Sequence, residues 1–173
     1  MTIAVIGATG KLGRALMQYT GTIACPIRFE EADKYKGWFE KNAEVDTVWH
    51  VARACRNYGV RRDHKTFLLE HTAMNKLLES RASACRFVYA STKVVYGHTS
   101  NESTPLSSNT IAGCFLDDLI GFSNCPEWKS DTRVNIDNLK SEHLVYAMTK
   151  LACERLISDK CPNYKILRIW DII

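Results

Sequence analysis

The sequence predicts an α/β fold in which the strands of one parallel sheet alternate with helices. Short, almost wholly apolar runs alternate with amphipathic stretches along the chain, and no repeat or low-complexity tract interrupts this order. Strands of a parallel sheet are buried on both faces, so they are continuously apolar rather than alternately apolar and polar. At 173 residues, the chain is long enough to bury one core as a single domain.

The first third of the chain predicts three strands and two helices. The first strand runs into a glycine-containing turn, which leads into a short helix, and a second strand and an amphipathic helix follow. The third strand is the nearly continuous apolar run that a parallel sheet buries on both faces. Strands are thus expected at residues 3–6, 22–29 and 47–52, and helices at 12–19 and 34–42.

The rest of the chain predicts two more helices and two more strands. Apolar side chains recur at helical spacing through the first of these helices, and Pro162 ends the second. The helices are expected at 63–80 and 142–159, and the strands at 86–90 and 164–169. Right-handed crossovers between such strands give a doubly wound, Rossmann-like parallel sheet in a single domain.

The composition indicates an intracellular protein without metal or nucleic acid. The net charge of +4 is mild, and the densest basic stretch, at 53–65, lacks interleaved aromatic residues, so no nucleic-acid partner is expected. The seven cysteines are scattered and form no C-x-x-C pair, so neither a disulfide framework nor a metal site is expected. Because no signal peptide or membrane-spanning run is visible, we expect a cytoplasmic protein that does not contact membranes.

The turn after the first strand has the glycine spacing of a dinucleotide-binding loop. Gly7 lets the chain turn tightly off the strand, Gly10 lets backbone approach a pyrophosphate, and Gly13 lets the helix pack closely on the sheet. The intervening residues are Thr9, Lys11 and Leu12, at the start of a helix whose free N–H groups suit phosphate. The strand before it and the helix after it favour phosphate binding over a plain glycine turn.

The residues after the second strand leave two cofactors open. An acidic residue about 20 positions beyond the glycine turn binds the ribose hydroxyl of NAD, whereas an arginine accommodates the 2′-phosphate of NADP. Arg28 here lies among Glu30, Glu31 and Asp33, and Glu30 or Glu31 could bind a 2′-hydroxyl, which would favour NAD. Arg28 favours NADP slightly, with NAD as the alternative.

A tyrosine and a lysine lie four residues apart in the last predicted helix. Tyr146 and Lys150 therefore project from one face of that helix. A lysine ammonium near a phenol stabilises the phenolate, which would allow Tyr146 to donate and accept a proton at a carbonyl or alcohol. Lys150 could also bind the ribose beside the nicotinamide.

Four motifs, taken in order, identify a family. These are the glycine turn at 7–13, His50-Val51-Ala52, the strand end Ser91-Thr92-Lys93-Val94-Val95-Tyr96-Gly97, and Tyr146 with Lys150. Together they resemble the extended short-chain dehydrogenase/reductase family, whose members act mostly on nucleotide sugars. The likeness covers nearly the whole chain.

The resemblance implies an enzyme with a Thr-Tyr-Lys site. Thr92 matches the family's catalytic Ser or Thr and would hydrogen-bond the substrate oxygen, while Tyr146 moves a proton and a hydride passes to or from the nicotinamide. Lys150 would assist Tyr146 and bind the ribose, and Ala52 and Arg53 would lie beside the cofactor. The substrate would be a small sugar-like alcohol or carbonyl, and the reaction an oxidation, reduction or epimerisation.

Some features depart from the family. The chain has one predicted strand between Gly13 and residue 46 where the family commonly has two, so the sheet is expected to be one strand short. An insertion is expected at about 107–139, and we expect the chain to lack the family's C-terminal substrate-binding portion. Exposed apolar surface would then favour a homo-oligomer. The alternative function is a dinucleotide-binding module or sensor without turnover.

Overall fold

A five-stranded parallel sheet forms the centre of the protein. The computed structural model describes residues 1–53, 64–92 and 141–169; the expected insertion at 107–139 lies outside these ranges. The strand order is β2-β1-β3-β4-β5, and every neighbouring pair is parallel. The strands are β1 (Ile3–Ile6), β2 (Thr22–Cys25), β3 (Thr47–His50), β4 (Arg86–Thr92) and β5 (Tyr164–Ile169). The predicted α/β fold with a parallel sheet is confirmed.

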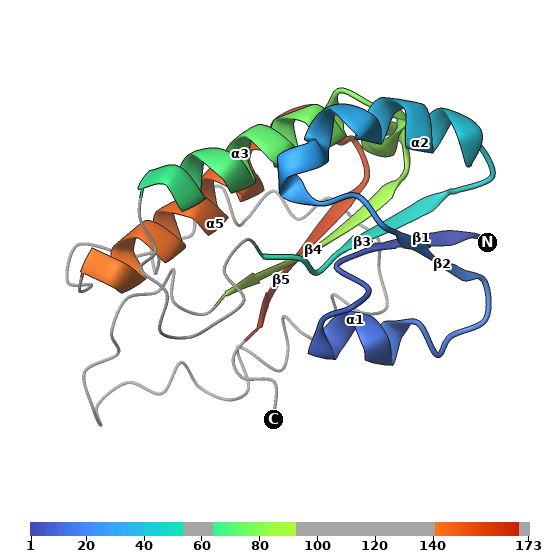
Figure 1. The fold of residues 1–173 in the computed structure, drawn as a ribbon, viewed down its shortest axis with the longest axis horizontal. Helices are drawn as coiled ribbons and strands as arrows, with labels where there is room; N and C mark the ends of the chain where they lie inside the picture. The colour runs from blue at the N-terminus through green and yellow to red at the C-terminus, as the bar shows by residue number, and fades with distance from the viewer. Residues whose placement is uncertain (54–63, 93–140, 170–173) are drawn as a thin grey trace.

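Helices cover both faces of the sheet (Figure 1). The short α1 lies on one face, and α2, α3 and α5 lie side by side on the other. The helices are α1 (Lys11–Leu16), α2 (Tyr35–Lys41), α3 (His64–Leu78) and α5 (Ser141–Lys160), with 3-10 turns η1 (Phe29–Lys34) and η2 (Arg81–Ala84). Right-handed crossovers require this arrangement, since the step from β1 to β2 runs opposite to all later steps.

Three predicted boundaries were wrong in the first part of the chain. The third strand was expected to reach residue 52 but ends at His50. The second strand was expected to reach residue 29 but ends at Cys25, because Pro26 has no N–H with which to continue the ladder. The first helix was expected to reach residue 19 but ends at Leu16. Tight turns follow, in which Tyr19 N donates to Leu16 O over 3.1 Å. As expected, a single strand lies between Gly13 and residue 46.

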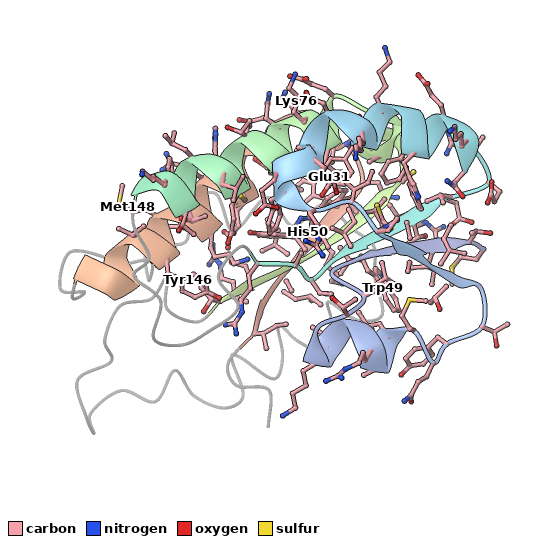
Figure 2. The ribbon with its side chains drawn as sticks, viewed as in Figure 1. Glu31, Trp49, His50, Lys76, Tyr146 and Met148 are labelled. Carbon is pink, nitrogen blue, oxygen red and sulfur yellow. The ribbon has the colours of Figure 1, made fainter. Side chains whose placement is uncertain are left out.

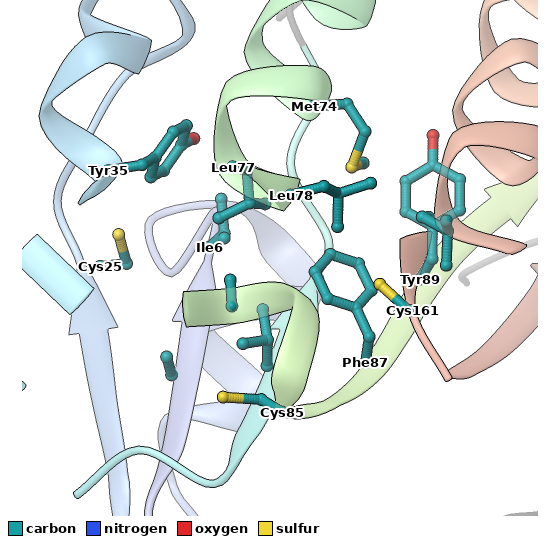
Figure 3. Close-up of a cluster of buried hydrophobic side chains, with 14 of the residues drawn as sticks. Ile6, Cys25, Tyr35, Met74, Leu77, Leu78, Cys85, Phe87, Tyr89 and Cys161 are labelled. Carbon is teal, nitrogen blue, oxygen red and sulfur yellow. The ribbon is translucent and has the colours of Figure 1, made fainter. Parts of the chain in front are cut away.

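The main core lies between the sheet and the three-helix layer. Phe87 and Tyr89 of β4 are fully buried and pack beneath Met74 and Leu77 of α3, as Figure 3 shows. Burial of each such side chain contributes about 1.5–3 kcal/mol relative to its exposure to water. Every second strand residue points into this core, which is the alternation that a sheet covered on one face by α2, α3 and α5 requires.

His50 is one of several polar side chains that are buried in the described part of the chain. It projects from β3 toward the helix layer, whereas its neighbour Trp49 projects toward α1 (Figure 2). Its ring centroid lies 5.4 Å from that of Tyr89 and 6.1 Å from that of Phe29. Its Nδ1 has no hydrogen-bond partner in the described part of the chain. Burial, with a smaller contribution from Lys150, lowers the pKa of His50 to about 3, so its ring is neutral in the folded protein at neutral pH.

This burial predicts an acid-sensitive fold. The pKa of His50 is lower in the folded chain than in the unfolded chain. The contribution of His50 to the free energy of unfolding is therefore constant above about pH 6.5 and is lost as the pH falls below that value. From pH 7 to pH 5 we expect the free energy of unfolding to fall by about 2 kcal/mol because of this residue. Denaturant titrations at the two pH values measure it. His50→Phe, which keeps an aromatic ring at this position, should remove this part of the pH dependence; an equal loss in both proteins would contradict the prediction.

Candidate active site

The turn between β1 and α1 lies directly against the end of β3. Gly7 has a φ of +93°, and a Cβ built on it would lie 2.7 Å from Ala52 N and 2.8 Å from Ala52 Cα. Backbone fills that space, so no side chain fits and only glycine adopts this φ without strain. Gly7 and Ala52, both expected at the cofactor, are therefore in contact.

The other two glycines differ in how tightly they are packed. A Cβ on Gly13 would lie 2.0 Å from Gly7 O, so α1 packs against the turn with no room for a methyl group. A Cβ on Gly10 would lie 3.3 Å from Gly7 O, and Gly10 is exposed. Its backbone is extended and its O accepts the Arg14 N–H over 2.9 Å. The outer side of Gly10 is therefore the open side of the turn, as a loop that receives a pyrophosphate requires.

The remaining predicted cofactor residues lie along the same edge. Thr9 and Lys11 are exposed and Leu12 is half-buried around the turn, and Arg53 is exposed beyond β3. The carboxyl ends of parallel strands meet at one edge, and β1 and β3 are paired with Ile6 opposite His50. The glycine turn therefore has the features that a dinucleotide-binding loop requires. Gly7 packs against Ala52, Gly10 is exposed, and the N-terminus of α1 follows.

Arg28 and the nearby acids occupy different electrostatic settings. Glu31 contacts Lys34, whose hydrogen bond and charge lower the pKa of the Glu31 carboxyl. Asp33 lies 3.4 Å from the Lys76 ammonium. Arg28 is exposed, and its charge adds a smaller lowering of the Glu31 pKa to that from Lys34. The guanidinium of Arg28 is therefore available to an anion, whereas Glu31 and Asp33 already have cationic partners.

Thr92 ends a strand that is longer than expected. β4 was predicted to stop at Ala90, but it continues to Thr92, and Ser91 and Thr92 pair with Arg168 and Ile169 of β5. The pairing with β5 is what extends it, since two hydroxyl residues alone favour a turn. Thr92 is buried, at the carboxyl end of β4.

Tyr146 and Lys150 lie together on α5, as their spacing predicts. The Lys150 Nζ is 5.8 Å from the centroid of the Tyr146 ring, and 4.9 Å from that of Tyr89 on β4. Figure 2 shows Tyr146 on the side of α5 nearer the sheet, while Met148 points outward. Thr92 is three residues beyond Tyr89 on the same strand. The strand that Lys150 covers therefore also carries Thr92.

The structure adds two buried carboxylates that the motifs do not include. Glu70 of α3 lies 3.9 Å from Lys150 Nζ. Glu154 of α5 is fully buried and accepts two hydrogen bonds from Arg168, over 3.2 Å at Oε1 and 2.8 Å at Oε2. Ser91 Oγ also donates to Glu154. A signal for Glu70 was present in the sequence: it lies three residues after Phe67 and four before Met74, on the apolar stripe of its helix.

The described residues hold no group of three or more His, Cys, Asp or Glu side chains that could bind a metal ion. The buried thiols there are not poised to react, since burial raises the pKa of Cys153 to about 12 and of Cys25 to about 11. In the same residues, no helix has both the length and the apolar character needed to cross a membrane.

Comparison with known proteins relates this fold to solved structures only. No family model and no curated protein matches the sequence. A dTDP-4-dehydrorhamnose reductase from Bacillus anthracis, in complex with NADP, matches with a TM-score of 0.64 at 14% identity, over 98% of this chain and 54% of that chain. The chain shares the fold of a reductase.

An NAD⁺ complex and an epimerase also match this fold. The enzyme WbmH from Bordetella bronchiseptica, in complex with NAD⁺, has a TM-score of 0.63 at 13% identity, over 96% of this chain and 55% of that chain. A UDP-N-acetylglucosamine 4-epimerase from Bacillus cereus has a TM-score of 0.56 at 20% identity, over 97% of this chain and 53% of that chain. The chain thus spans about half the length of these structures. The resemblance to the extended short-chain dehydrogenase/reductase family is confirmed at the level of the fold.

The packing of Gly13 predicts that its substitution damages the turn. A Cβ in Gly13→Ala would collide with Gly7 O, so we expect a loss of about 1–3 kcal/mol in stability and NADPH binding at least about tenfold weaker. Thermal melts and energy transfer from tryptophan to NADPH measure the two effects. Gly37→Ala is the matched control, because nothing lies within 4 Å of a Cβ there. It should leave binding unchanged and, in a helix, add up to about 1 kcal/mol of stability. Equal behaviour of the two variants would contradict the assignment.

Proposed function

We propose that this chain is the dinucleotide-binding and catalytic part of an NAD(P)-dependent oxidoreductase or epimerase that acts on a sugar-like alcohol or carbonyl. The observation that carries the proposal is the contact of Lys150 on α5 with Tyr146 on the same helix and with Tyr89 of β4, the strand that ends at Thr92. The glycine turn follows β1 of the same parallel sheet. Two of the solved structures that share this fold are a dTDP-4-dehydrorhamnose reductase and a UDP-N-acetylglucosamine 4-epimerase. A nucleotide sugar is therefore the substrate class that we propose.

Each residue then has a defined role in the reaction. A bound nicotinamide would accept or supply a hydride at its ring carbon. In the oxidation direction, the Tyr146 phenolate takes the proton of the substrate hydroxyl as the carbon loses its hydride and the C=O bond forms. Thr92 donates a hydrogen bond to the substrate oxygen, and the Lys150 ammonium stabilises the phenolate. In the reduction direction, Tyr146 returns the proton to the oxygen.

The proposed cofactor is NADP, with NAD as the alternative. Arg28 supports NADP because an exposed guanidinium beyond β2 could pair with a 2′-phosphate, whereas Glu31 and Asp33 are held by Lys34 and Lys76. The relatives in fold bind either cofactor, since their complexes contain NADP, NADPH or NAD⁺. We further propose that the chain self-associates.

We propose as the alternative function a module that binds a dinucleotide without turning over a substrate, because the glycine turn around Gly7 and Gly13 by itself supports only cofactor binding. The two functions differ in what they require of Tyr146, because only an enzyme uses its hydroxyl group.

Tyr146→Phe separates the enzyme from the module. Loss of the hydroxyl removes the proton donor and acceptor, so we expect turnover to fall by about 10²–10⁴-fold while NADPH binding stays within about twofold. Reduced-nicotinamide absorbance with a panel of free and nucleotide-linked sugars measures turnover. Tyr19→Phe is the control, since Tyr19 is exposed and contacts the ring of Trp49. If neither the parent nor Tyr146→Phe turns over any sugar while both bind NADPH, the module is the correct reading.

Arg28→Ala tests whether Arg28 selects NADP over NAD. Loss of a charge-assisted bond to a 2′-phosphate should weaken NADPH binding about ten- to a hundredfold and leave NADH binding unchanged. Parallel fluorescence titrations with the two nucleotides measure both constants. Arg155→Ala removes the same charge from an exposed position on α5 and should change neither. If Arg28→Ala weakens neither nucleotide, NADP is not selected by this arginine.

A further inference from the structure

The interior of the protein holds a complete ion pair between two helices. Glu70 Oε2 on α3 lies 3.9 Å from Lys150 Nζ on α5, and their side chains are only 5% and 3% exposed. Taking either charge out of water alone is expensive, and a buried lysine without a counter-charge tends to lose its proton. The two helices pack against each other along their length (Figure 1), so water has little access to Lys150.

The other groups that face Lys150 do not supply this negative charge. They come from three elements: Tyr146, Cys153 and Glu154 on α5, Tyr89 on β4, and His50 on β3. Burial holds Tyr89, Cys153 and His50 in their neutral forms, since it raises the pKa values of the first two and lowers that of His50. Glu154 is already engaged by the guanidinium of Arg168.

We infer that Glu70 is a positioning residue, the counter-ion that keeps Lys150 an ammonium ion and holds it beside Tyr146. Lys150 reaches this place through a long side chain that could otherwise adopt many rotamers. With Glu70 on one side and the rings of Tyr89 and Tyr146 at 4.9 and 5.8 Å, its Nζ is fixed by one charge and two aromatic faces. The catalytic consequence, a stabilised Tyr146 phenolate, rests on the proposed function.

The test follows the proton on Lys150 by NMR of protein that contains isotope-labelled lysine. The Lys150 signal is assigned by its absence in Lys150→Met. In Glu70→Gln, which has nearly the same shape without the charge, we expect Lys150 to lose its proton at a pH lower by at least about one unit. Glu79→Gln makes the same change at an exposed position directly after α3, where Glu79 pairs with Lys76. It should leave the titration of Lys150 unchanged. An unchanged titration in Glu70→Gln would overturn the inference.

Two further variants separate charge from structure. Glu70→Asp keeps the carboxylate on a shorter side chain and should restore at least half of the shift, which a loss of packing would not explain. If Glu70→Gln does not fold, the reciprocal variant Lys150→Met is used with labelled glutamate. Without the ammonium, the buried Glu70 carboxyl should take up its proton at a pH higher by at least about one unit than in the parent. No change there would also overturn the inference.

The inference and the proposed function fail in different ways. NADPH titration of the parent and of Glu70→Gln is run beside the NMR experiment. Absence of NADPH binding in the parent argues against the proposed function but leaves the lysine titration readable. An unaltered lysine titration with intact NADPH binding argues against the role of Glu70 alone.

Discussion

Parallel pairing of β1 with both of its neighbours is the constraint on which the rest of the structure depends. Its register sets Ile6 opposite Cys25 of β2 on one side and His50 of β3 on the other. Since all strands run the same way, the chain leaves each of them at a single edge. Gly7 and Ala52, which are distant in sequence, consequently meet there with no space for a methyl group between them. Polar groups that follow the strands gather at the edge for the same reason.

The close approach at Gly7 also explains why α1 exists. The helix has six residues, Lys11–Leu16, far fewer than the roughly 12–15 that an isolated helix needs to be marginally stable in water. Its stability must therefore come from contacts. Gly13 supplies them, because the absence of a side chain lets the first turn of the helix rest on Gly7 O. The glycines thus fix the helix as well as the open face of the turn.

The parts of the structure that depend on local pattern could be predicted, and the parts that depend on distant partners could not. Continuous apolar runs predicted all five strands, and the spacing of Tyr146 and Lys150 predicted their shared face. The end of β4 was missed because β5, more than 70 positions away, extends the ladder to Thr92. The charge of Glu70 on an apolar stripe indicated a buried partner, but no spacing identifies Lys150 on another helix as that partner. The roles of Thr92, Tyr146 and Lys150 in a reaction remain predictions.

Two buried ion pairs on α5 fix how that helix sits on the protein. Lys150 pairs with Glu70 of α3, while Glu154, one turn further on, pairs with Arg168 of β5. Removing one partner of such a pair typically costs about 3–5 kcal/mol, because the other charge stays buried without compensation. A slide or rotation of α5 by one residue would break both pairs at once, since the partners belong to different elements and cannot follow together. Apolar packing alone tolerates such shifts more easily. The pairs therefore favour one register of the helix, and that register places Lys150 over the Tyr89 ring of β4.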